Sequence, residues 1–111
     1  MIFVTGPLFA GKQDYICAAL GWTQEMFDAH GVRDVERLAE QAGDLPTLAD
    51  ALAAHEVVIA TEIGGGVVPV DAGQREARER AGRLACQLAQ RAEVVVRVCC
   101  GLPQVLKGKL P

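Results

Sequence analysis

The chain opens with a short apolar run, residues 2–5, that breaks into a loop bounded by Gly6 and Gly11 and ends in Lys12. A strand, a glycine-bounded turn and a helix in this order form the layout of a phosphate-binding loop, because the first backbone N–H groups of the helix face an anion. The pattern therefore predicts a buried strand at residues 2–5, an anion-binding turn, and a helix at residues 12–20.

The residue that follows Lys12 departs from the usual nucleotide-binding pattern. A Ser or Thr hydroxyl normally holds the Mg²⁺ that accompanies a nucleoside triphosphate, and this chain has Gln13 in that place. A glutamine amide oxygen is a neutral and weaker ligand for Mg²⁺, and Asp14 lies about 100° further around the helix axis. Gly6, Gly11, Lys12 and Gln13 are therefore the candidate nucleotide-binding residues, with Mg²⁺ binding weakened and no metal ligand assigned.

Two further apolar runs complete a small sheet. Val57–Thr61 is apolar without alternation, as suits a strand covered on both faces, and residues 94–100 form a similar run. Helical periodicity occupies the segments between the strands, at residues 12–20, 24–29, 34–42, 47–55 and 74–92. This order predicts an α/β fold, a small P-loop-type three-layer domain with a short, mostly parallel sheet, in which residues 1–111 form a single domain.

The carboxyl ends of the predicted strands mark the place where a ligand would bind. The glycine loop follows the first strand, Glu62 the second and Gly101 the third, so all three would share one edge of the sheet. Glu62 precedes glycines 64–66, which allow backbone to approach a ligand closely. We therefore expect Glu62 to orient Mg²⁺ or water near Lys12; the alternative is a solvated carboxylate at a strand end.

Other charged residues favour structural interpretations. Arg75, Arg78, Arg80 and Arg83 alternate with glutamates at helical spacing, which indicates ion pairs within the helix rather than a phosphate site. Arg97 lies inside the last strand, where a charge indicates an edge position, a partner carboxylate or a subunit interface. Of these, we expect an edge or an interface.

Composition argues against several classes of function. The net charge is −3 with no basic block, and aromatic residues make up 5% of the chain, so we expect no nucleic-acid binding. No apolar run approaches the roughly 20 residues of a membrane-spanning helix. The apolar start lacks a basic leader, so we expect a cytoplasmic protein. The four cysteines lack Cys-x-x-Cys spacing, which favours buried reduced thiols over a metal site.

Residues 61–69, Thr-Glu-Ile-Gly-Gly-Gly-Val-Val-Pro, resemble the Asn-Glu-Val-Gly-x-Gly-Ile-Val-Pro segment of the adenosylcobinamide kinase/adenosylcobinamide-phosphate guanylyltransferase family. The resemblance continues through Arg78, Ala-Gly-Arg-Leu at residues 81–84, Gln87 and Ala89 to Gly-Leu-Pro at residues 101–103. The first twelve residues resemble the family's Val-Thr-Gly-x-x-x-Ser-Gly-Lys-Ser start. Two blocks at opposite ends agree, and the chain looks like a shortened, divergent member.

The resemblance implies a P-loop α/β fold and a place late in cobalamin assembly. Members of the family phosphorylate the aminopropanol arm of adenosylcobinamide with ATP or GTP and then transfer GMP from GTP through a histidine-linked intermediate. By this resemblance the ligand would be GTP or ATP, a corrinoid would be a second partner, and the assembly would be a homo-oligomer, often a trimer. Lys12 and Glu62 would be the catalytic residues, with Lys12 stabilising the transferred phosphoryl group.

Departures from the family pattern indicate impaired or altered catalysis. The segment with the Asp-Cys-Leu-Thr-like Mg²⁺ motif and the guanylylated histidine is missing, Gln13 replaces the Mg²⁺-binding Ser, and Pro7 removes one loop amide. His30 is a candidate for guanylylation, because a neutral, oriented imidazole can form a phosphoramidate. Its surroundings do not match the family's histidine segment, and a structural histidine at a helix end is the alternative.

Three hypotheses follow. The first is a nucleotide-binding protein of cobalamin biosynthesis which, if active, is a kinase or nucleotidyltransferase acting on adenosylcobinamide or its phosphate. The second is a non-catalytic structural or regulatory paralogue that acts through the family's oligomer interface. The third is a small kinase for another alcohol. Mg²⁺-dependent binding of GTP or ATP would separate the first hypothesis from the second.

Overall fold

A computed structural model describes residues 1–63 and 71–111. The sheet has five strands in the order β2-β3-β1-β4-β5, and all pairs are parallel except that of β5 with β4. The strand that precedes the glycine loop, β1, is therefore the middle strand. Along the chain the strands are β1 (Ile2–Gly6), β2 (Gly31–Val32), β3 (Val57–Thr61), β4 (Val94–Cys99) and β5 (Leu102–Lys107).

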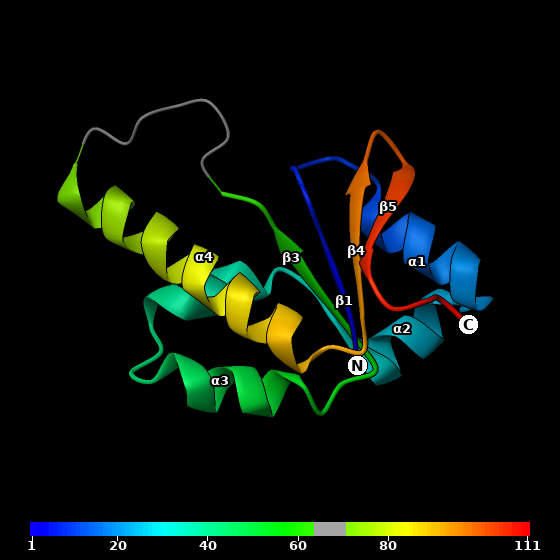
Figure 1. Cartoon of the computed structure of the whole chain (residues 1–111), viewed down its shortest axis with the longest axis horizontal. Coiled ribbons are helices and arrows are strands. Elements are labelled where there is room, and N and C mark those ends of the chain that lie inside the picture. The colour runs from blue at the N-terminus through cyan, green and yellow to red at the C-terminus, as the bar shows by residue number, and fades with distance from the viewer. Residues whose placement is uncertain (64–70) are drawn as a thin grey trace.

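Helices cover both faces of the sheet. One face carries the 3₁₀ helix η1 with α3 and α4, and the other carries α1 and α2 (Figure 1). This arrangement confirms the predicted α/β fold with three layers and a mostly parallel sheet. Along the chain the helices are α1 (Lys12–Leu20), α2 (Gln24–His30), η1 (Val35–Glu40), α3 (Leu45–Leu52) and α4 (Ala72–Arg91).

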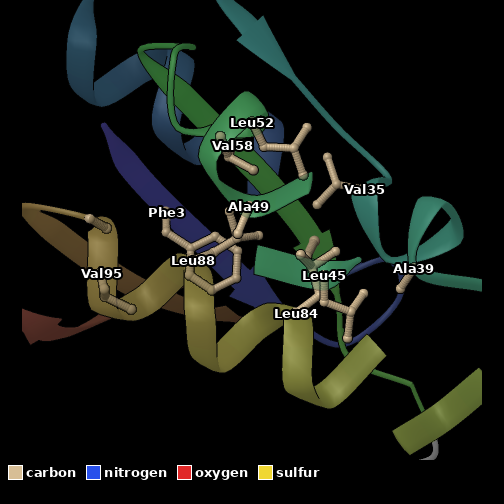
Figure 2. Packing of buried hydrophobic residues seen from close by; sticks show 12 residues of the cluster. Phe3, Val35, Ala39, Leu45, Ala49, Leu52, Val58, Leu84, Leu88 and Val95 are labelled. Carbon is tan, nitrogen blue, oxygen red and sulfur yellow. The ribbon is translucent and has the colours of Figure 1, made fainter. Parts of the chain in front are cut away.

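Two apolar cores hold the layers together, because successive strand residues point to opposite faces. Phe3 points to one face and packs with Leu84 and Leu88 of α4, and Figure 2 shows these side chains with those of η1 and α3 gathered over the sheet. Val4 points to the other face and packs with Ile16 of α1. Every strand of the parallel core is thus covered on both sides, which explains its unbroken apolar sequence.

The sequence predicted that the strand at residues 94–100 is the last one, but in the structure a fifth strand, β5, follows it. Cys100 and Gly101 both have positive φ, 54° and 72°, as in the two-residue turns that join antiparallel strands. The chain then returns along β4 as β5. Lys107 ends β5, and its Nζ donates to the carbonyl oxygens of Ala89 and Gln90, at 3.0 and 3.2 Å. These bonds tie the end of β5 to the last turn of α4.

Three further local predictions need correction. The predicted helix at residues 34–42 is the shorter 3₁₀ helix η1, preceded by Asp34 with φ 58°. Arg83 pairs with Glu79 within α4 as predicted, but Arg80 donates instead to carbonyl oxygens of residues 39 and 42 and so ties α4 to η1. The cysteines are free thiols as predicted, although Cys86, Cys99 and Cys100 are exposed rather than buried.

Glycines 64–66, which were expected to let backbone approach a ligand beside Glu62, lie outside the described residues. Within residues 1–63 and 71–111, no helix combines the length and the apolar character that crossing a bilayer requires.

Candidate functional site

Backbone geometry explains the glycines at the two ends of the loop. Gly6 ends β1 with φ 154°, and a Cβ on it would lie 2.1 Å from the Val98 carbonyl oxygen of β4. Gly11 is the N-cap of α1, with φ 80° in the left-handed region. Such conformations favour glycine. The loop therefore leaves β1 in close contact with β4 and enters α1 through a left-handed residue.

The loop is fastened to the neighbouring strands at both ends. The Glu62 N–H, just after β3, donates to the Gly6 carbonyl oxygen at 2.9 Å, and the Gly101 N–H donates to the Ala10 carbonyl oxygen at 2.8 Å. The predicted meeting of the loop, Glu62 and Gly101 at one edge of the sheet is thus confirmed. Because both bonds come from strand ends, the sheet itself sets the shape of the loop.

Lys12 lies inside the loop rather than in bulk solvent. Lys12 is only 8% exposed, and its Nζ donates a hydrogen bond to the Pro7 carbonyl oxygen at 2.7 Å. Burial lowers the pKa of Lys12, while the nearby charges of Glu36, Asp34 and Glu62 oppose that decrease. An ammonium group has three N–H donors, so Lys12 can hold the Pro7 carbonyl and still donate to an anion.

A cavity of about 380 Å³ lies between the loop and the carboxyl ends of β2 and β3. Known small-molecule sites have volumes of about 300–1,000 Å³. Phe9 and Leu8 form part of its wall but remain 94% and 64% exposed, so they do not fill it. The cavity is lined by Leu8, Phe9, Ala10, Gly11, Lys12, Gln13, Asp14, Gln24, Arg33, Asp34, Ile59 and Thr61.

The side-chain amide of Gln13 is engaged on both of its polar atoms. Nε2 donates to Gln24 Oε1 of α2 at 2.8 Å, and Oε1 accepts a hydrogen bond from Arg33 Nη1 at 3.0 Å. Arg33 follows the two-residue strand β2 directly. The position that carries a Mg²⁺-binding hydroxyl in ordinary P-loops therefore faces a guanidinium group in this chain.

Glu36 is a site-neighbouring residue that the sequence analysis missed. It lies in η1, is 6% exposed, and its Oε1 accepts a hydrogen bond from the Thr61 N–H at 2.7 Å. The buried carboxylate thus anchors the end of β3 beside Lys12. The helical pattern assumed for residues 34–42 gave no signal for it, because the tighter 3₁₀ turn decides which side chains point inward.

Glu62 forms an ion pair with Arg97 that crosses the end of β1. Arg97 Nε lies 2.6 Å from Glu62 Oε1 and Nη2 lies 3.0 Å from Oε2. The hydrogen bonds from Arg97 lower the pKa of Glu62, and its carboxylate stays ionised near neutral pH. The expected edge position for Arg97 was wrong, because β4 lies between β1 and β5. The Glu62 carboxylate is a partner for its charge within the chain, and the expected subunit interface stays a prediction.

A family model for cobinamide kinase / cobinamide phosphate guanyltransferase matches residues 15–106. The chain belongs to this family. The match confirms the resemblance seen in residues 61–103 and extends it back to α1. It begins after Lys12, so the glycine loop lies just outside the matched range. Among curated proteins, none matches the chain at a significant level.

His30 lies at the other end of the sheet from the loop. Its carbonyl oxygen accepts the N–H of Glu56, the residue before β3, at 2.9 Å, and its Nδ1 lies 3.7 Å from the Glu56 carboxylate. The Trp22 ring lies 6.0 Å away, centroid to centroid. Since five strand residues span about 15 Å, the structure does not bring this family member's His30 to Lys12.

The residues predicted to bind the nucleotide or to act in catalysis at the loop divide into two groups. Gly11, Lys12 and Gln13 line the cavity, whereas Gly6 and Glu62 lie beside it and shape the loop. Within residues 1–63 and 71–111, no group of three or more His, Cys, Asp or Glu side chains could hold a metal ion. With Gln13 and Glu62 both bonded to arginines, the described residues do not fit the Mg²⁺ that accompanies a nucleotide in ordinary P-loops.

Proposed function

We propose that this chain binds GTP or ATP at its Gly6–Lys12 loop and acts in cobalamin biosynthesis, as a cobinamide kinase/guanyltransferase-type protein with impaired or altered catalysis. One observation carries the proposal: the buried Lys12 lines a cavity at the start of α1. The first N–H groups of a helix lack partners within the helix. Together with the Lys12 ammonium they form an anion site suited to the phosphates of a nucleotide.

The same residues suggest how a phosphoryl group would be handled. Phosphoryl transfer depends on positioning and on neutralising charge at the transferred group, and Lys12 would supply part of that charge. Glu62, held ionised by Arg97, would orient the loop through its backbone bond to Gly6. Family membership supports the hydroxyl or phosphate of a cobinamide as the acceptor. Because Gln13 does not replace the missing hydroxyl ligand, we expect turnover to be slow.

Calorimetric titration with GTP and ATP tests the proposal. We expect the Lys12→Ala protein to bind at least about tenfold more weakly, because a hydrogen bond to a charged group contributes about 1.5–3 kcal/mol. Lys109→Ala removes the same charge from an exposed position outside the cavity, and should leave binding unchanged. A Lys12→Ala protein that binds both nucleotides as well as the parent would contradict the proposed site.

A second candidate function is a non-catalytic partner that acts through an oligomer interface. The observation in its favour is the edge strand β5, where Leu102, Val105 and Leu106 are 70%, 48% and 55% exposed. An edge strand with exposed apolar residues is able to pair with another chain. Sedimentation velocity would report a homo-oligomer, a trimer by family resemblance. An oligomer that gives no calorimetric response to either nucleotide would favour this candidate over the first.

A further inference from the structure

We propose that the cavity binds the phosphates of its nucleotide without Mg²⁺, and that the Arg33 guanidinium supplies the positive charge that the metal supplies in ordinary P-loop proteins. This inference rests on the proposed function and names the chemical form of its ligand: a metal-free diphosphate or triphosphate. At the position where ordinary P-loops hold Mg²⁺ with a hydroxyl, this chain has the Gln13 amide, whose oxygen is bonded to Arg33.

Hydrogen bonds between α1 and α2 fix the orientation of the Gln13 amide. Gln13 Nε2 donates to Gln24 Oε1, and Gln24 Nε2 in turn donates to Asp28 Oδ1, both at 2.8 Å. A carboxylate only accepts hydrogen bonds when ionised, so Asp28 sets the direction of both amides. The Gln13 oxygen is therefore turned toward Arg33.

Arg33 has donors to spare for an anion. Its side chain is 63% exposed and lines the cavity, and its bond to Gln13 uses one of five guanidinium N–H groups. Asp34 faces it across 3.6 Å, a looser contact than the 3.0 Å bond to Gln13. A phosphate offers the planar guanidinium two parallel hydrogen bonds, which a solvated aspartate at that distance does not.

Electrostatic repulsion prevents Mg²⁺ and the Arg33 guanidinium from both lying next to Gln13 Oε1. A Mg²⁺ bound to Gln13 Oε1 would lie next to the Arg33 guanidinium, and cations a few ångström apart repel strongly at a partly buried site. Among the residues that line the cavity, Lys12 and Arg33 balance Asp14 and Asp34. Lys12 and Arg33 are the two cationic side chains of this lining, and both can donate hydrogen bonds to a terminal phosphate at the place where a metal would otherwise stand.

The experiment is calorimetric titration with GTP and with inorganic pyrophosphate, each in EDTA and in excess Mg²⁺. We expect the wild-type protein to bind both probes at least as tightly in EDTA. Arg33→Gln should weaken binding in EDTA by at least about tenfold. Arg33→Lys keeps the positive charge but loses the planar guanidinium that donates two parallel hydrogen bonds, so its affinity should lie between those of the wild type and Arg33→Gln. Arg37→Gln is the matched control, since Arg37 lies four residues further on, is 80% exposed and does not line the cavity.

The outcomes separate this inference from the proposed function. Binding that requires Mg²⁺ overturns the metal-free site and leaves nucleotide binding intact. Arg33→Gln binding equal to that of Arg37→Gln in EDTA overturns the role of Arg33. A protein that binds GTP in neither buffer overturns both proposals. Thermal unfolding of each variant checks that the chain is folded, because Arg33 is largely exposed and its replacement should shift the melting temperature very little.

Discussion

Replacing Gly6 by alanine tests the tightest backbone contact at the loop. The added Cβ would lie 2.1 Å from the Val98 carbonyl oxygen, so β1 or β4 must move by roughly 1 Å before the contact reaches the 3.0 Å that real Cβ atoms keep. The neighbouring atom is backbone in the centre of the sheet, and it cannot turn away as a flexible side chain could. The φ of 154° adds strain, because L side chains rarely adopt it.

The expected loss of stability has two parts. Overpacking of a well-packed region costs about 1–3 kcal/mol, and an unfavourable φ costs about 1–2 kcal/mol. Gly6→Ala should therefore lower the free energy of unfolding by about 2–5 kcal/mol. Since a domain is stable by only about 5–15 kcal/mol, this is a large fraction of the total, and the loop should lose its shape with it.

Two control variants divide the effect into its parts in urea-unfolding measurements. Gly101→Ala meets nothing within 4 Å but keeps φ 72°, so it reports strain alone, about 1–2 kcal/mol. Gly82→Ala lies in α4 with open space around it and should stabilise the protein by up to about 1 kcal/mol. If Gly6→Ala is no more destabilised than Gly101→Ala, the close approach of β1 to β4 is wrong.

Two more measurements test the ion pair and the core. Glu62→Gln should lower the free energy of unfolding by at most about 1 kcal/mol at neutral pH, because both side chains of the pair are 38% exposed. The pKa of Glu62 is lowered in the folded protein, so its stabilisation is complete above the unfolded pKa of about 4.3 and is lost as pH falls through the folded pKa; a difference between variant and parent that grows in acid would refute the assignment. Leu88→Ala should cost about 2–5 kcal/mol in urea unfolding, since Leu88 is fully buried over the sheet (Figure 2); a cost below about 1 kcal/mol would mean that α4 packs elsewhere.

Elements with long or simple patterns could be predicted from the sequence, and elements that depend on distant partners could not. The unbroken apolar run Val57–Thr61 identified a covered parallel strand, and Gly6, Gly11 and Lys12 identified the loop. The strand β5 was missed because its residues are all exposed and carry no periodic signal. Its pairing follows from the turn at Cys100, a residue that the sequence gives no reason to expect at positive φ.

The candidate site was predictable in outline but not in its charges. The strand-end rule brought Glu62 to the loop, yet no local pattern links Glu62 with Arg97, thirty-five positions away. Arg33 and Glu36 were overlooked for the same reason: each acquires its role from a partner on another element, Gln13 for the first and Thr61 for the second. Such pairings are properties of the folded sheet, and a one-dimensional pattern does not contain them.

The turn between β4 and β5 has a consequence for how the C-terminal segment should be treated in the laboratory. Gly101 carries the N–H that holds the loop carbonyl of Ala10, Lys107 caps α4, and Leu110 packs against the core of α1. Truncating or tagging this segment would therefore disturb the loop beside the proposed nucleotide cavity, although no residue of β5 lines that cavity. An affinity handle or fluorophore placed there would perturb the very affinity it is meant to measure, and the exposed start of α4 is the safer attachment point.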